Sequence, residues 1–364
     1  MTPVWPLILA EIFKLFGTYT FKAFLATSGF NIACSTATCV PIHATAKRIG
    51  GKATASLATW LWAVFPTAIL LTYESLWDAS LTALILTTLL WATIAVAESH
   101  SIRYWAGYGL LWGFGLMTNA AILSVLPFLF GWAEYRSYKT KQTHPRNWIL
   151  AAAAAAACCI PWTARNFQTF HTFVPLRSVG GLALWLGNNE NGDGLSARQH
   201  PISNQRERDR YMEMGEIAYM AEKQSQAVRH IAAHPARTFH LSLQRFTAIW
   251  TGTSGHLLED FRRAKSIRFY LVVGTDILAA LGTLLGLFFL ARERNPYWIP
   301  LATFPVVFPL VYYLALAPPR YRHPIDPALL ILTAASLKAI GASLNRLAHL
   351  RRKRPNHGQP SNPS

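Results

Sequence analysis

Two carboxylates stand four residues apart in a short polar stretch between apolar segments. The stretch is Tyr73-Glu74-Ser75-Leu76-Trp77-Asp78, and this spacing places Glu74 and Asp78 on one face of a helix. Carboxylates at the edge of an apolar segment can act as a general base or bind a cation. A solvated loop in which Asp78 is the N-cap of the next helix is the alternative. The residues alone leave both open.

A second cluster carries positive charge at the end of an apolar segment. It is Pro318-Pro319-Arg320-Tyr321-Arg322-His323-Pro324. One guanidinium group can bind two oxygens of a phosphate at once. Arg320, Tyr321 and Arg322 are therefore expected to bind a phosphate at the depth of the lipid headgroups. Ordinary anchoring of the helix at the membrane interface is the competing interpretation. Asp326-Pro327 then supplies an N-cap and a first-turn proline.

A third group combines cations with sugar-compatible side chains. Its members are Arg165, Arg177, Trp185, Asn188 and Asn189. Asparagine amides both donate and accept hydrogen bonds, and an indole face suits a sugar ring. Each residue is nonspecific by itself, and together they predict a sugar-binding surface.

Three further residues carry chemistry without a clear partner. His230 and His234 stand four residues apart, but Ile231 occupies the glutamate position of an HExxH pattern. Exposed helix histidines are the simpler interpretation. Asp276 lies about two turns inside an apolar segment, where a carboxylate is costly, so it is a candidate site residue. No complete ligand set appears, so we expect no bound cofactor and leave dependence on a divalent metal open.

The segments that position these residues are apolar and suited to a bilayer. Of the 364 residues, 52% are hydrophobic and 14% are charged, whereas soluble domains carry about 25% charged residues. The apolar segments lie near 17–40, 54–73, 79–97, 105–119, 120–134, 148–161, 269–290, 297–316 and 326–344. Each approaches the length that spans a membrane as a helix. The sequence therefore predicts about nine spans, with a tight turn near Asn119.

The basic residues indicate how the spans are oriented. The net charge is +17, but Lys and Arg gather in short loops and in a tail, which fits anionic lipid and not nucleic acid. The basic loops contain Lys47 to Lys52, Arg103, Arg136 to Arg146, and Arg292 to Arg294. We therefore expect a multi-pass protein of the inner (plasma) membrane with a cytoplasmic C-terminus. Nine spans would place Met1 outside, so the chain is expected to begin downstream of an original first span.

The expected organisation has four parts. They are N-terminal membrane helices (1–161), an extracytoplasmic domain (162–267), C-terminal membrane helices (268–344) and a basic cytoplasmic tail (345–364). Pro161 should end the sixth span, and Leu182–Trp185 should be extended. One helix is predicted from about Asn204 to Ala233, and a second follows His234-Pro235 with an apolar stripe suited to a membrane surface.

The order of the motifs resembles the bacterial glycosyltransferase family 39-like proteins. These are GT-C-fold relatives of protein mannosyltransferases and of the lipid A aminoarabinose transferase. The resemblance covers nearly the entire chain and is most specific at 161–189 and 318–327. Its motifs are Tyr73–Asp78, Gly113–Pro127, Pro161–Asn166, Phe173–Ser178, Gly181–Asn189 and Arg320–Pro324. It implies an all-α, polytopic, GT-C-like membrane protein with one extracytoplasmic insert.

The resemblance also implies a reaction. A sugar would pass from a polyprenyl-phosphate donor to a lipid or protein acceptor, with an outward carboxylate deprotonating the acceptor hydroxyl and inversion at the anomeric carbon. By position, Glu74 or Asp78 would be that carboxylate, and Arg320 and Arg322 would hold the lipid phosphate. Met1–Ala10 resembles the stretch that follows the family's principal aspartate loop. A noncatalytic scaffold or relic, a transporter, and an O-antigen polymerase or ligase are therefore the alternatives.

Overall fold

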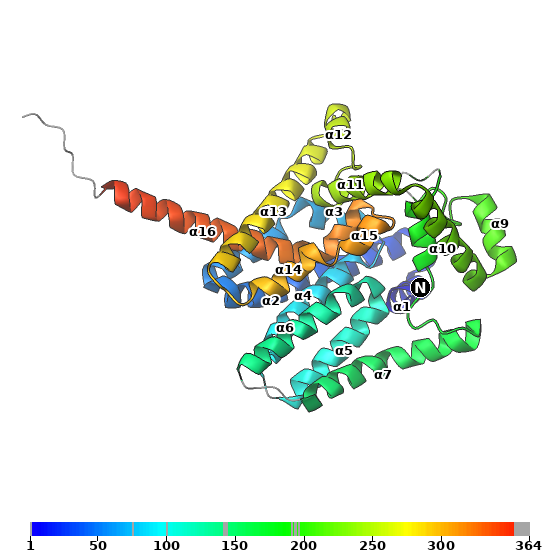
Figure 1. Ribbon diagram of the computed structural model, residues 1–364, viewed down its shortest axis with the longest axis horizontal. Helices are drawn as coiled ribbons and strands as arrows, with labels where there is room; N and C mark the ends of the chain where they lie inside the picture. The colour runs from blue at the N-terminus through cyan, green and yellow to red at the C-terminus, as the bar shows by residue number, and fades with distance from the viewer. Residues whose placement is uncertain are drawn as a thin grey trace, which may run out of the picture.

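The chain folds into a helical bundle with a helical domain at one end (Figure 1). The computed structural model describes residues 2–74, 76–99, 101–140, 145–190, 192, 195 and 197–352, and this part contains no strand. The first half contains α1 (Val4–Phe16), α2 (Phe21–Ala63), α3 (Pro66–Glu74), α4 (Ala79–Val96), α5 (Ile102–Thr118), η1 (Ala120–Val125), α6 (Leu126–Lys139) and α7 (Pro145–Phe170). The second half contains α8 (Gly180–Gly187), α9 (Gln205–Met214), α10 (Glu216–Ala233), α11 (Pro235–Thr251), α12 (Leu257–Arg263), α13 (Ile267–Arg292), α14 (Trp298–Val306), α15 (Leu310–Leu314), η2 (Pro319–Ile325) and α16 (Asp326–Arg352).

Five of the described helices are long and apolar enough to cross a membrane. They are α2, α4, α7, α13 and the continuous η2–α16 segment. Some of the apolar segments expected to span are broken in the structure. The segment 54–73 divides before Pro66, and the segment 297–316 divides before Leu310, which follows Pro309. Proline lacks the amide hydrogen that a continuous helix needs.

Two breaks follow the sequence prediction. The expected turn near Asn119 is confirmed: α5 ends at Thr118, and Asn119 is extended with φ −145° and ψ 115°. The basic stretch from Lys47 to Lys52 contains the kink of α2, where Gly51 has φ +77°. Glycine tolerates this left-handed region because it lacks a Cβ. The long α2 is therefore two helices joined at Gly51.

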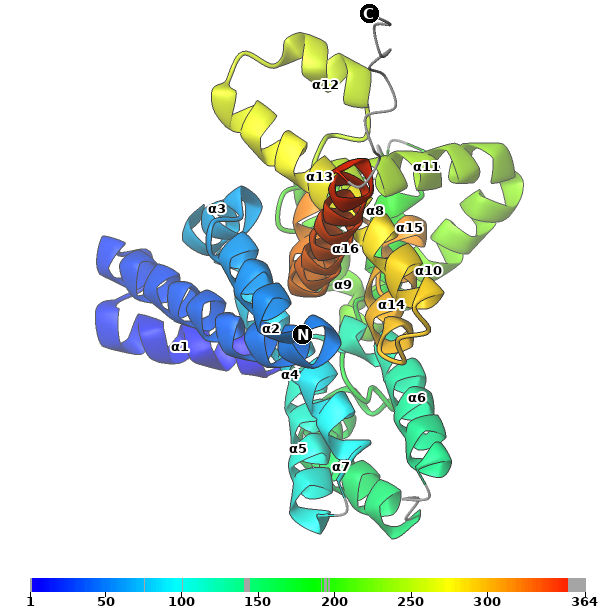
Figure 2. The same ribbon diagram turned by 90° about the vertical axis from the view of Figure 1, so that its left-hand side faces the viewer.

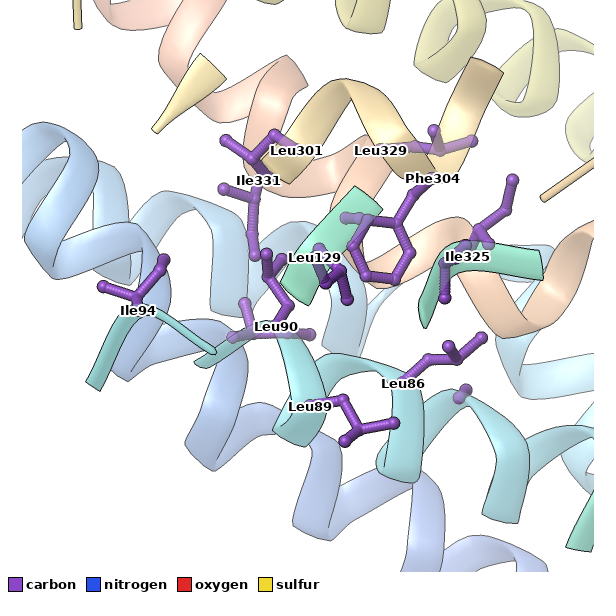
Figure 3. Close-up of a cluster of buried hydrophobic side chains, with 14 of the residues drawn as sticks. Leu86, Leu89, Leu90, Ile94, Leu129, Leu301, Phe304, Ile325, Leu329 and Ile331 are labelled. Atoms are coloured by element: carbon purple, nitrogen blue, oxygen red, sulfur yellow. The ribbon is translucent and has the colours of Figure 1, made fainter. Parts of the chain in front are cut away.

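The core of the bundle surrounds α4. This helix is apolar on every side, which is typical of a helix covered all round, and it contacts α2, α5, α6 and η2. Figure 3 shows Leu86, Leu90 and Ile94 of α4 within one buried cluster. The cluster also includes Leu129 of α6, Phe304 of α14 and Leu329 of α16 (Figure 3). This packing holds α4 in place, and α4 begins directly after Asp78.

Small residues allow the outer helices to pack closely. A Cβ at Gly109 of α5 would lie 2.1 Å from the carbonyl oxygen of Ala151 on α7. A Cβ at Gly286 of α13 would lie 2.2 Å from the carbonyl oxygen of Leu332 on α16. Such contacts replace the hydrophobic effect where helices associate inside lipid.

The loops between helices contact one another in two groups. The basic loops form one group, and the loops near Asp78 and Asn119 form the other. In one group, Arg48 pairs with Glu98, and Tyr297 Oη donates to Glu98 at 2.8 Å. Asn295 Nδ2 donates to the carbonyl of Ile49 at 3.2 Å, which joins the end of α13 to α2. In the other group, the turn before α4 meets the break at Asn119. The alternation of loops expected from the sequence agrees with these contacts.

The domain at one end of the bundle differs from expectation in three places. Pro161 does not end its helix, because α7 continues to Phe170 with the proline inside it. Leu182–Trp185 belongs to α8, since a short apolar run fits a buried helix as well as a strand. The predicted helix from Asn204 to Ala233 is divided into α9 and α10 at Gly215, where φ is +74°.

The two ends of the molecule are far apart. Figure 1 shows α9 and α10 at the end opposite the end of α16. Figure 2 shows α1 beside α2, away from α16. The predicted basic tail is described as far as Arg352, where it continues α16; its later residues lie outside the described part.

The α5–α7 contact predicts a difference between two glycines on one helix. Gly109→Ala should destabilise the protein by about 1–3 kcal/mol, because the added Cβ meets backbone that cannot move freely. Gly107→Ala should be neutral or stabilising, since nothing lies within 4 Å of its Cβ position. Thermal unfolding of the detergent-solubilised protein measures both. Equal unfolding temperatures would contradict the close packing.

Candidate functional site

Asp78 lies in the turn between α3 and α4, and two side chains hold its carboxylate. Asn119 Nδ2 donates to Oδ2 at 3.2 Å, and Thr82 Oγ1 donates to the same oxygen at 3.4 Å. Asp78 occupies the N-cap position of α4, but its side chain makes no capping hydrogen bond. The hydrogen bonds from Asn119 and Thr82 thus both go to Oδ2. The backbone amide of Asp78 also interacts with the carboxylate.

The surroundings of Asp78 favour its protonated form more than water does. Burial raises the pKa of the Asp78 carboxyl, because the charged form loses solvation. The Arg177 guanidinium and the hydrogen bonds from Thr82 and Asn119 lower this pKa in part. The net effect is a raised pKa. Such a carboxyl is suited to accept a proton during a reaction near neutral pH.

The neighbouring chain segments fix Asn119 and the Asp78 turn. Asn119 Oδ1 accepts a hydrogen bond from the Ala121 amide at 3.0 Å, so its amide nitrogen is left to bind Asp78. Residues at the start of the chain hold both sides of this contact: Thr2 lies just before α1, and Trp5 lies within it. Thr2 Oγ1 donates to the Thr118 carbonyl at 2.8 Å, and Trp5 Nε1 donates to the Leu76 carbonyl at 3.0 Å.

The other predicted carboxylate is Glu74. It is the last residue of α3, and its side chain lies outside the described part of the structure. Asp78 is therefore the carboxylate for which the geometry is established.

Three side chains near the end of α7 hold the segment that carries Arg177. Trp162 Nε1 donates to the Leu176 carbonyl at 3.0 Å, and Thr163 Oγ1 donates to the Pro175 carbonyl at 2.8 Å. Asn166 Nδ2 donates to the carbonyl of Val174 at 2.9 Å. Together these bonds satisfy three consecutive carbonyls of an irregular segment. They place Arg177 where it acts electrostatically on Asp78.

A cavity of about 300 Å³ lies beside these residues. It is lined by Arg165, Asn166 and Arg177, together with Glu216 of α10, Thr2 before α1, and Pro6 and Leu7 of α1. The predicted residues Arg165 and Arg177 therefore share one cavity.

Arg320 and Tyr321 lie on a neighbouring part of the site. The Arg320 guanidinium lies 5.0 Å from the Trp77 ring centroid, next in sequence to Asp78. The Tyr321 ring lies 4.8 Å from the ring of Tyr312. The charges of Asp78 and Arg177 act on the Tyr312 hydroxyl. Arg177 and Arg320, predicted from separate loops, thus lie in the neighbourhood of Asp78.

Arg322 occupies a different environment from Arg320. Its side chain is 2% exposed and forms ion pairs with Asp276 at 2.5 Å and Asp326 at 2.7 Å. Its Nη1 donates to the carbonyl of Trp250 at 3.2 Å, and Thr67 Oγ1 donates to Asp276 at 2.7 Å. The partner of Asp276 that the sequence did not reveal is therefore Arg322. This ion triad joins η2, α13 and α16 inside the bundle.

Trp185, Asn188 and Asn189 lie inside the helical domain, away from the cavity. The Lys223 ammonium lies 3.6 Å from the Trp185 ring centroid. Asn188 Nδ2 donates to the Leu314 carbonyl at 2.6 Å, and Asn189 Nδ2 donates to the Trp185 carbonyl at 2.8 Å. These side chains connect α8 to α10 and α15 in this structure. Sugar binding by them stays a prediction.

No metal cluster is evident in the described residues: no group of three or more His, Cys, Asp and Glu side chains is arranged to hold an ion. The rings of His230 and His234 stack on each other with centroids 4.5 Å apart.

Two members of the site were not found from the sequence. Asn119 was expected as a turn residue but not as the partner of Asp78, although an asparagine between apolar segments was a usable signal. Tyr312 lies in the apolar run 297–316, where nothing distinguishes it from a packing residue.

The environments of Arg322 and Arg320 predict different effects on stability when each side chain is replaced. Arg322→Met should destabilise the protein by about 3–5 kcal/mol, because Asp276 and Asp326 would remain buried without their cation. Arg320→Met should change stability little, since Arg320 forms no ion pair with a described residue. Thermal unfolding in detergent compares the two variants. Similar losses in both would contradict a structural role specific to Arg322.

Comparison with known families and structures supports the resemblance seen in the sequence. The profile of the dolichyl-phosphate-mannose-protein mannosyltransferase family matches residues 1–164. No curated protein sequence matches the chain.

Solved structures of an archaeal oligosaccharyltransferase share the fold. The apo form of the Archaeoglobus fulgidus enzyme aligns with 99% of this chain at 12% identity and a TM-score of 0.52. The same enzyme, AglB, in complex with an inhibitory peptide and a dolichol-phosphate aligns with 99% of this chain at 11% identity and a TM-score of 0.50. This chain covers 45% and 44% of the respective structures, less than half of their length. The chain thus has the all-α membrane fold of the GT-C glycosyltransferases, and over residues 1–164 it is similar to the dolichyl-phosphate-mannose-protein mannosyltransferases.

Proposed function

We propose that this protein transfers a sugar from a polyprenyl-phosphate donor to a hydroxyl acceptor on the extracytoplasmic side of the membrane, with Asp78 as the general base. The observation that carries the proposal is the Asp78 carboxylate. Asn119 and Thr82 both donate to one of its oxygens, and the proposal assigns the other oxygen to the acceptor hydroxyl. Cationic side chains adjoin it on the same surface.

The reaction can be written with its atoms and electrons balanced. Asp78 Oδ1 accepts the proton of the acceptor hydroxyl, and the acceptor oxygen forms a bond to the anomeric carbon. The bond between that carbon and the phosphate oxygen breaks, and the phosphate leaves with the electron pair as polyprenyl phosphate. A general base in this position typically contributes about 10²–10⁴-fold to the rate. A guanidinium stabilises the charge that develops on the departing phosphate.

Arg320 is suited to the phosphate. It lies against Trp77 beside the catalytic turn and forms no ion pair with a described residue. Arg322 lies two residues further on, and its guanidinium donates to the two carboxylates of the triad. We therefore assign the lipid phosphate to Arg320 and a supporting role to Arg322, which fixes η2.

The sidedness follows from the loop charges. The loops that contain Lys47, Arg48 and Arg292 meet at the end of the bundle away from Asp78. Basic short loops favour the cytoplasmic face. This supports an orientation with Asp78 and α8–α11 outside the cytoplasm. The similarity of residues 1–164 to the mannosyltransferase profile and the dolichol-phosphate bound by a structural neighbour support a lipid-linked donor.

Removal of the base tests the proposal directly. Asp78→Asn should reduce transfer by about 10²-fold or more, because the amide cannot accept the proton. Asp209→Asn on the exposed helix α9 should retain activity. Purified protein in liposomes would be given polyprenyl phosphate carrying labelled mannose or glucose, with a membrane extract as the source of acceptor. Full activity in Asp78→Asn would refute the assignment of the base.

The pH dependence of transfer should respond to Arg177. Its guanidinium lowers the pKa of Asp78, so Arg177→Gln should raise that pKa. Since the base acts when deprotonated, the acid limb of kcat/KM should move to higher pH in the variant. Arg206→Gln on α9 should leave the limb in place. A limb that stays or moves to lower pH in Arg177→Gln would contradict the electrostatic contact.

A further inference from the structure

The cavity lined by Arg165 and Arg177 has cationic groups that the catalytic step does not use. We propose that it is the acceptor subsite and that the acceptor is a sugar bearing an anionic group, phosphate or carboxylate, bound by Arg165 and Arg177. This inference rests on the proposed transfer function and names the class of its acceptor.

Arg165 is exposed, packs against two aromatic rings, and has donors that described residues do not use. Its guanidinium lies 5.0 Å from the Trp162 ring centroid and 5.7 Å from that of Phe170. Nη1 donates to Asn166 Oδ1 at 3.1 Å, and this is its one hydrogen bond to the described residues. A guanidinium has five N–H donors. The remaining donors of Arg165 can bind a planar or tetrahedral anion.

Arg177 adds a second cation to the same cavity. Its side chain donates no hydrogen bond to a described residue. The backbone just before it is held by the hydrogen bonds that α7 side chains donate to the carbonyls of residues 174–176. Two guanidinium groups therefore line one cavity with donors that described side chains do not satisfy.

The one carboxylate in the lining does not neutralise these cations. Glu216 Oε1 accepts a hydrogen bond from the Ser178 hydroxyl, and Oε2 accepts one from Tyr211 Oη at 3.3 Å. Glu216 forms no ion pair with a described residue. The cavity therefore keeps a positive charge, which favours an anionic ligand.

Size and position indicate a sugar next to the base. A volume of about 300 Å³ accommodates one or two sugar rings with a charged substituent. The indole of Trp162 and the ring of Phe170 supply apolar walls. Thr2 lines the cavity, and its hydroxyl donates to the Thr118 carbonyl. The next residue, Asn119, donates to Asp78. An anion held by Arg177 would thus place a sugar hydroxyl near the Asp78 carboxylate.

Arginine footprinting tests this proposal without requiring transfer. The full chain in detergent would be treated with phenylglyoxal and the modification of each arginine followed by mass spectrometry. The probes are glucuronate, glucose 6-phosphate, neutral glucose and short-chain phosphatidylglycerol, all at equal ionic strength set with sodium chloride. Exposed Arg206 on α9 is the internal control.

The proposal expects protection by the two anionic sugars alone. At about twice the Kd of the probe, modification of Arg165 and Arg177 should slow about threefold, because occupancy removes the reactive free form. Arg206 should be modified at an unchanged rate. In Arg165→Gln the protection of Arg177 should be lost, whereas Arg229→Gln should retain it. Equal protection by glucose, protection by phosphatidylglycerol alone, or no protection would each overturn the proposal.

The same measurement separates this inference from the proposed function. Asp78→Asn should keep the protection by glucuronate, since anion binding does not need the base. If Asp78→Asn retained full transfer activity while the protection was observed, the assigned base would fail and the subsite would stand. If Asp78→Asn lost transfer activity and no probe protected the arginines, the subsite would fail and the base would stand.

Discussion

The structure depends on a buried cation between two carboxylates. Arg322 binds Asp276 of α13 and Asp326 of α16, and all three side chains are almost inaccessible to solvent. Charged groups inside an apolar bundle are tolerated when they pair with one another. This pairing determines where η2 lies between the two helices. Arg320 and Tyr321 belong to η2, so their place beside the turn that carries Trp77 and Asp78 follows from the triad.

A second constraint acts at the other side of Asp78. The segment 174–176 has no helical hydrogen bonds of its own, and side chains of α7 supply partners for its carbonyls. Thr2 and Trp5 at the start of the chain anchor the turns at Thr118 and Leu76 in a similar way. The candidate site is therefore built from irregular segments held by rigid helices, an arrangement common in functional sites.

The sequence predicted the fold class and several members of the site, but not their roles in the packing. Asp78 was recognisable from its spacing to Glu74, and Arg320 from its place in a cluster with Tyr321 and Arg322. Arg320 and Arg322 could not be distinguished, since the partner Asp276 lies 46 residues away and nothing local identifies it. Trp185 and Asn188 have sugar-compatible chemistry, yet α10 and α15 cover them. Local chemistry was visible in the sequence, whereas contacts between distant helices were not.

The length of α7 determines how far the candidate site lies from the centre of the membrane. Its 26 residues extend about 39 Å at about 1.5 Å per residue, whereas the hydrocarbon core is about 30 Å thick. A helix that crosses the core must therefore project beyond it by about 9 Å, or about six residues. With Pro145 at the opposite edge, these are the residues from Arg165 to Phe170, and Arg165 and Asn166 would stand at the level of the lipid headgroups. A lipid phosphate reaches that depth without leaving the membrane, and a water-soluble acceptor reaches it without entering.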